Sequence, residues 1–276
     1  MAILASKWSF ERSLMVSIVY LNGEFLPEDQ AFIPVTDRGF LFGEGVFTTI
    51  KVEEGKPEFL SLHLQKLESD CRILEIPCEL FKNDAIQELI QRNNALNEVW
   101  RLKILVTGGN HLMTLMPYPG HPSPCRLACY PNPVCRIHPN IKTLAFLDHL
   151  TLAEYAIKRG FHDALFFDPQ GFILETSIAN FFWRLGNTVY FPDLSLPVYP
   201  GVTLKVLLQA FAKMGLNCQP IKARLEEISK GAQLYICNSM KGFVPVVEIE
   251  GTKYERDLFF ENSLKKFFRE EMNSGM

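Results

Sequence analysis

The sequence has 276 residues, of which 47% are hydrophobic and 21% are charged, and its formal net charge is −3. These values are typical of a globular protein with ample material for a core, arranged as one large domain or two of ordinary size. The small net charge gives no reason to expect a nucleic acid or an acidic membrane surface as partner, and no apolar run approaches the roughly 18–20 residues that span a bilayer.

The N-terminal residues carry no convincing structural pattern. Charged residues interrupt the apolar ones in residues 1–15, which makes this stretch a poor signal peptide. We interpret it as a disordered extension and expect a cytoplasmic protein. The first convincing strand covers residues 17–21 and turns at Asn22-Gly23, a dipeptide favoured in hairpins.

Two glycines precede the next predicted strand. Gly43 and Gly45 flank Glu44 just before an apolar run over residues 46–52. Glycine at such positions allows a close approach of backbones or a positive φ. A Gly-x-Gly turn alone is usually only a turn, so the pattern predicts local geometry rather than function.

A predicted amphipathic helix over residues 58–75 follows this strand. Its apolar residues recur at helical spacing, and His63 and Lys66 lie three apart outside that stripe. A second helix is predicted over 82–94 and a strand over 101–107. We read 110–124 as loop because it is rich in proline and short of periodicity.

A further strand over 126–130 completes a small N-terminal α/β domain, predicted over 16–130. Prolines crowd the next ten residues, so 131–140 is predicted as an interdomain linker and 141–276 as a larger C-terminal domain. The seven cysteines are odd in number and scattered, which is typical of reduced thiols. Cys125, Cys129, Cys135 and His138 have the atoms that zinc prefers, but their spacing fits no tight metal knuckle, and we predict no metal site.

Three chemically distinct parts follow one another in the second half of the chain. Lys142 precedes a predicted helix over 147–159, and Glu175 ends the second strand of a hairpin that turns at residues 168–171. Pro200-Gly201-Val202-Thr203 then opens a helix predicted over 202–214. An amine can form a Schiff base with an aldehyde, a carboxylate can keep a pyridine nitrogen protonated, and a helix start can bind a phosphate. Pyridoxal phosphate carries an aldehyde, a pyridine nitrogen and a phosphate, so it could interact with all three parts.

The chain resembles the class IV aminotransferases, which are the fold-type IV pyridoxal-phosphate enzymes. The resemblance spans about residues 19–247 and rests on several motifs in a fixed order. These are TDRGFLFGEGVFTTI (36–50), HLQKL (63–67), IKTL (141–144), DALFFDPQGFILETSIANFFW (163–183), PGVT (200–203) and ICNSMKGFVPV (236–246). The resemblance implies a two-domain α/β (α+β) fold, with pyridoxal 5'-phosphate in the cleft between the small and the larger domain, and a homodimer.

The resemblance also implies roles for individual residues. Lys142 would be the catalytic lysine that carries the cofactor, and Glu175 would contact the pyridine nitrogen. The cofactor phosphate would be held by Lys66, Val202, Thr203 and Ser239, and the substrate by Phe42, Thr48, Thr49 and Asn238. Three residues depart from the family pattern: Lys66 and Gly108 stand where arginine is usual, and Ala145 stands where asparagine is usual.

Among the family members, 4-amino-4-deoxychorismate lyase looks most similar, because of Phe47-Thr48-Thr49 and Ile236-Cys237-Asn238. We therefore expect elimination of pyruvate to give 4-aminobenzoate for folate biosynthesis. An aminotransferase for branched-chain or D-amino acids is the alternative. A third hypothesis, motivated by the three departures, is a member that has lost catalysis and serves as a binding protein.

Overall fold

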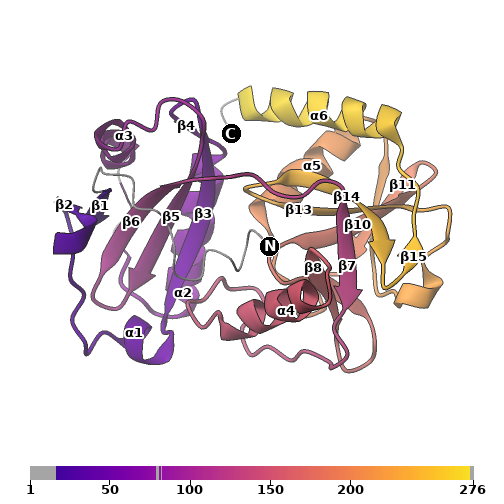
Figure 1. Cartoon of the computed structure of the whole chain (residues 1–276), viewed down its shortest axis with the longest axis horizontal. Coiled ribbons are helices and arrows are strands. Elements are labelled where there is room, and N and C mark those ends of the chain that lie inside the picture. The colour runs from indigo at the N-terminus through magenta and orange to yellow at the C-terminus, as the bar shows by residue number, and fades with distance from the viewer. Residues whose placement is uncertain (1–16, 79–80, 82, 274–276) are drawn as a thin grey trace. The chain divides into compact units, whose positions relative to one another are not determined.

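The computed structural model describes residues 17–78, 81 and 83–273, and its internal contacts divide the chain into two compact units. The first comprises residues up to Pro119 together with Ile141–Phe146, and the second comprises Gly120–Asn140 and the chain from Leu147 onward. Both units combine helices with a sheet (Figure 1). The predicted α/β fold in two parts is confirmed, whereas the extension predicted over 1–15 lies outside the described residues.

The first unit is built on a six-stranded sheet in the order β2-β1-β6-β5-β3-β4, in which all neighbours are antiparallel. Alternate side chains of the long central strands enter a core beneath helices α2 and α3, where Val46, Ile50 and Ile86 are fully buried. The elements are β1 (Ile18–Leu21), β2 (Glu24–Pro27), α1 (Arg38–Phe42), β3 (Gly45–Glu53), β4 (Lys56–Pro57), α2 (Leu60–Ile73), α3 (Asn83–Arg92), β5 (Val99–Thr107) and β6 (His111–Pro117).

One predicted element of this unit is wrong. Residues 110–124 were expected to be loop, but His111–Pro117 form β6, which pairs with the whole length of β5. Met113 and Leu115 alternate into the core. This period-2 signal covers too few residues to outweigh the prolines that follow it.

The second unit holds a nine-stranded mixed sheet in the order β12-β11-β10-β13-β14-β7-β8-β9, with β15 paired to β14. Helix α4 packs on β8, while α5 packs on α6 through the stacked rings of Phe211 and Phe260. The elements are β7 (Cys125–Cys129), α4 (Leu147–Lys158), β8 (Asp163–Phe167), β9 (Ile173–Thr176), β10 (Asn180–Leu185), β11 (Thr188–Pro192), α5 (Val202–Lys213), β12 (Asn217–Ile221), β13 (Gln233–Asn238), β14 (Gly242–Ile249), β15 (Thr252–Lys253) and α6 (Leu258–Asn273).

The turn between β8 and β9 shows how local sequence fixes this hairpin. The Asp168 carboxylate accepts hydrogen bonds from the amides of Gln170 and Phe172, and Gly171 has a φ of 84°. Aspartate is favoured in turns for this reason, and glycine adopts positive φ without strain. The predicted hairpin is therefore confirmed, and it places Glu175 near the end of β9. None of the helices in the described ranges is long and apolar enough to cross a membrane.

Candidate active site

Lys142 belongs to the first unit because its segment extends the sheet beside β3. The Leu144 amide donates to the Gly45 carbonyl at 2.9 Å, and Thr143 forms a β-bridge with Val46. The sequence assigned residues 141–146 to the larger domain. Their hydrogen bonds to β3 are the physical reason that the contacts group them with the smaller one.

Gly43, which lies just before β3, and Gly45, the first residue of β3, are both required by the same segment. Gly43 has a φ of 70°, and a Cβ atom there would lie 2.9 Å from the backbone of Ala145. A Cβ atom on Gly45 would lie 2.6 Å from Leu144. Close approach and positive φ, the two reasons expected for these glycines, are both confirmed.

Aromatic rings surround the Lys142 ammonium. Its Nζ lies 4.9 Å from the ring centre of Phe47 and 5.5 Å from that of Phe146. Lys103 of β5 places a second ammonium 4.5 Å from the Phe47 ring, and burial together with the charge of Arg101 lowers the pKa of Lys103. Among the described residues no acidic side chain pairs with Lys103, so this cation is available for an anionic ligand.

The two candidate threonines of β3 point to opposite faces of the sheet. Thr48 is buried on the helix side, where its Oγ1 lies 2.8 Å from Nδ1 of His63. Burial, and secondarily the charge of Lys142, lower the pKa of His63 to about 3, so the ring is neutral near pH 7. Thr49 shares a face with Phe47 and stands opposite Lys103 in the strand register.

Lys66 and Lys142 are both tied to one buried carboxylate. Lys66 Nζ forms an ion pair with Oδ1 of Asp70 one turn along α2, and the Lys142 main-chain amide lies 3.4 Å from Oδ2. Asp70 is 1% exposed. Burial raises the pKa of Asp70, although its hydrogen bond with Lys66 acts in the opposite direction.

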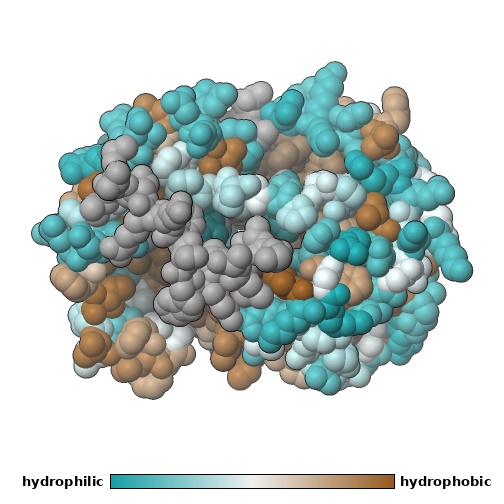
Figure 2. Space-filling view, viewed as in Figure 1, coloured by the Kyte–Doolittle hydropathy of each residue, from teal (hydrophilic) through white to brown (hydrophobic). Residues whose placement is uncertain are grey.

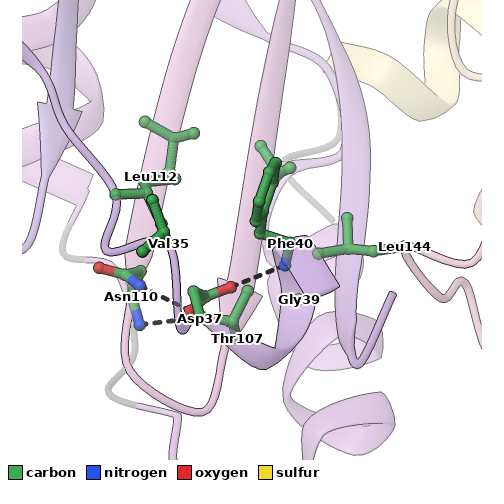
Figure 3. A pocket seen from close by; sticks show the side chains of 10 residues that line it. Val35, Asp37, Gly39, Phe40, Thr107, Asn110, Leu112 and Leu144 are labelled. Atoms are coloured by element: carbon green, nitrogen blue, oxygen red, sulfur yellow. Dashed lines mark hydrogen bonds between the residues drawn. The ribbon is translucent and has the colours of Figure 1, made fainter. Parts of the chain in front are cut away.

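Phe42 lies on the surface of its unit, with its side chain 64% exposed and stacked beneath the Arg38 guanidinium. Figure 2 shows hydrophobic side chains gathered over α1. An apolar pocket adjoins this helix (Figure 3). The polar side chains that line it bond to one another, since the Asp37 carboxylate accepts hydrogen bonds from the side chains of Thr107 and Asn110. Phe42 does not line that pocket, and its substrate role stays a prediction.

In the second unit, Glu175 accepts hydrogen bonds from Arg136, Tyr199 and Asn180. Its Oε1 accepts from Arg136 Nη1 at 2.7 Å and from the Tyr199 amide at 3.1 Å, and its Oε2 accepts from Asn180 Nδ2 at 3.0 Å. Glu175 is 4% exposed. Donors of this kind favour the ionised carboxylate and fix its orientation.

The start of α5 has the donor set that a phosphate requires. Gly201 precedes the helix without a side-chain cap, and Val202 and Thr203 follow in its first turn. Uncapped amides and the helix dipole attract anions. A Cβ atom on Gly201 would lie 2.2 Å from Oδ1 of Asn180, so glycine is required where this loop meets the neighbour of Glu175. The residues present therefore suit a phosphate-bearing cofactor.

The remaining candidates have mixed placements. Ser239 is half-buried in the turn between β13 and β14. The Asn238 side chain donates to the Ile178 carbonyl and accepts from the amides of Met240 and Lys241, so it organises that turn. Gly108 is exposed, and a Cβ atom added there would have no neighbour within 4 Å.

Three residues that contact the candidate site residues were not predicted from the sequence. Asp70 and Lys103 each looked like one more charge on a helix or a strand. Arg136 lies in the proline-rich stretch predicted as linker, yet it bonds Glu175 and lies 4.7 Å from the Phe166 ring centre. Only the pairing of the strands and the folding of the linker bring these charges to their partners.

Known proteins share this fold. A family model described as amino-transferase class IV matches residues 45–249, well over half of the chain, and the chain therefore belongs to that family. The aminodeoxychorismate lyase of Bacillus subtilis (strain 168) is 25% identical over 258 residues, which cover 86% of this chain and 88% of the relative.

Two solved structures illustrate the likeness in fold. The branched-chain aminotransferase of Thermoproteus uzoniensis with norvaline has a TM-score of 0.85 at 17% identity and covers 94% of this chain and 96% of its own. A hypothetical aminotransferase from Mycobacterium tuberculosis in a PLP-bound form has a TM-score of 0.81 at 18% identity. The match covers 94% of this chain and 99% of that structure's chain. At these identities the likeness concerns the fold alone.

Proposed function

We propose that this chain is a pyridoxal-phosphate-dependent 4-amino-4-deoxychorismate lyase, which releases pyruvate and leaves 4-aminobenzoate for folate biosynthesis. The observation that carries the proposal is the arrangement on one face of the first sheet. There the amine of Lys142 and the ammonium of Lys103 flank the same Phe47 ring, and Thr49 stands opposite Lys103. An amine for the reaction and a cation for a carboxylate suit this substrate, which carries two carboxylates. The similarity to the Bacillus subtilis lyase supports the same choice.

The cofactor, when bound, supplies an aldehyde for the substrate amine and a ring that withdraws electrons from the neighbouring carbon. Lys142 Nζ takes the proton from the amine-bearing ring carbon, the bond from the adjacent carbon to the enolpyruvyl oxygen breaks, and the ring becomes aromatic. The proton on Lys142 then goes to the departing enolpyruvyl group, which leaves as pyruvate. The Lys142 amine would replace the product amine on the cofactor, which frees 4-aminobenzoate.

The other candidates assist this proton transfer. The rings of Phe47 and Phe146 lie beside the Lys142 amine and would help to orient it. Glu175, which accepts hydrogen bonds from Arg136 and Asn180, would contact the pyridine nitrogen and favour its protonated form. Val202 and Thr203 at the start of α5, Ser239 and Lys66 would be the residues that hold the phosphate.

An aminotransferase for branched-chain or D-amino acids would use the same lysine, and the family name favours this alternative. The two functions differ in their need for an amino acceptor. Purified protein should release 4-aminobenzoate and pyruvate in equal amounts with no keto acid added. Turnover that requires 2-oxoglutarate would instead establish the aminotransferase.

We also propose a homodimer. Several large apolar side chains near α1 are strongly exposed, among them Phe32, Val35 and Phe40, at 79%, 76% and 73%. A contiguous apolar surface of this kind is unusual on a monomer, and a two-fold dimer would cover it.

A further inference from the structure

Lys66 is the candidate for the phosphate-binding cation on α2. The only other basic side chain of that helix apart from histidine, Arg72, is 75% exposed and paired with Glu68. His63, at the N-terminal end of the helix, is buried and neutral near pH 7 because its pKa is about 3. The positive charge that this helix can offer to a phosphate therefore resides on Lys66.

That charge is already matched within the helix. Asp70 is 99% buried, and its Oδ1 forms an ion pair with the Lys66 ammonium. Its second oxygen faces the main-chain amide of Lys142 at 3.4 Å. A pair of opposite charges i to i+4 on a helix surface is usually of small energetic consequence. This pair differs because its carboxylate is buried between α2 and the segment that carries the candidate catalytic lysine.

We propose, on the basis of the proposed cofactor, that Asp70 is a positioning residue that competes with the cofactor phosphate for the Lys66 ammonium and so sets how readily this protein releases its cofactor. A phosphate that reaches Lys66 comes close to the Asp70 carboxylate, and two anions in a poorly solvated site repel each other. An arginine could donate to both anions through its fork of N–H groups, whereas a lysine offers one compact charge.

The competition is tested by comparing two ligands that differ in the phosphate. Apo-protein is titrated with pyridoxal phosphate and with pyridoxal, and the visible absorbance of the lysine-bound form gives both dissociation constants. In Asp70→Asn, which has almost the same shape, we expect binding of pyridoxal phosphate to tighten about tenfold, or about 1.4 kcal/mol. Binding of pyridoxal should stay the same. Unchanged or weaker binding of pyridoxal phosphate in a folded Asp70→Asn protein overturns the proposal.

A control and a second variant make the test specific. Glu68→Gln removes the same charge from the same helix, but Glu68 faces solvent and Arg72, so the ratio of the two affinities should not move. Equal tightening in Glu68→Gln would mean a general charge effect and would overturn the proposal. If Asp70→Asn does not fold, Lys66→Arg decides. This variant should bind pyridoxal phosphate several-fold more tightly, relative to pyridoxal, than the wild type does. An unchanged ratio of the two dissociation constants overturns the proposal.

The test also separates this inference from the proposed function. Wild-type protein that forms no lysine-bound species with either ligand contradicts both. If the wild-type protein binds pyridoxal phosphate but Asp70→Asn leaves the ratio of the affinities for pyridoxal phosphate and pyridoxal unchanged, only the competition is contradicted. The proposed function then stands.

Discussion

The main-chain amide of Phe47 donates a hydrogen bond to the carbonyl oxygen of Lys142, with 2.9 Å between nitrogen and oxygen. Phe47 lies in β3, a strand of the first sheet, and the centre of its ring is 4.9 Å from the Lys142 ammonium. The same residue therefore fixes both the backbone and the side chain of the candidate catalytic lysine. Substitutions that disturb this contact should affect the attachment of the cofactor before they affect the rest of the fold.

Gly43→Ala tests this dependence. The new Cβ would lie 2.9 Å from the backbone of Ala145, at a residue whose φ is 70°, so we expect a loss of about 1–3 kcal/mol in unfolding free energy. We also expect the variant to carry less lysine-bound cofactor. Denaturant unfolding measures the loss of stability, and visible absorbance measures the bound cofactor. Gly108→Ala is the matched control because nothing lies near that position. Equal behaviour of the two variants would argue against the contact.

Lys103→Gln should weaken substrate binding more than it slows turnover. Removal of a charge-assisted hydrogen bond typically costs about 1.5–3 kcal/mol, so KM should rise by about tenfold to a hundredfold while kcat changes less. The absorbance of the bound cofactor should not change. Arg101→Gln, two residues away on the same face of β5, is the control. A KM that is unaltered in Lys103→Gln would remove Lys103 from the substrate site.

His63 should make the folded state sensitive to mild acid. Its pKa is about 3 in the folded protein and about 6.5 in the unfolded chain, so between these values the unfolded state binds the extra proton. Stability should therefore fall as the pH drops from about 6.5 toward 3, by up to about 1.4 kcal/mol per pH unit.

Urea unfolding at several pH values measures this dependence. His63→Asn should flatten the curve in that window, whereas replacement of the exposed His138 by asparagine should leave it unchanged. An identical pH dependence in wild type and His63→Asn would show that the buried ring is not the cause.

The exposed apolar residues around α1 predict the effect of a charge on assembly. Phe40→Glu should lower the fraction of dimer in size-exclusion chromatography with light scattering. Phe259→Glu, which places the same charge at an 84% exposed site on α6, should not. A wild-type protein that is monomeric at micromolar concentration would contradict the dimer.

Local sequence was sufficient for much of the fold and for part of the candidate site. The glycines at 43 and 45 and the turn at Asp168 were predictable because one residue type satisfies a steric or hydrogen-bonding need that neighbours in sequence reveal. Strand β6 was missed because its alternation is short and is followed by prolines. Asp70 and Arg136 could not be predicted because their roles depend on partners 72 and 39 residues away, at Lys142 and Glu175.

The most direct test of the account is the visible absorption spectrum of freshly purified protein, recorded before and after borohydride, with the modified peptide identified by mass spectrometry. We predict a visible band that borohydride abolishes, with the reduced cofactor attached to Lys142 and no attachment in Lys142→Ala. A protein that shows no band even after incubation with pyridoxal phosphate, or that carries the label on another lysine, would contradict the assignment of Lys142 and the enzyme built on it.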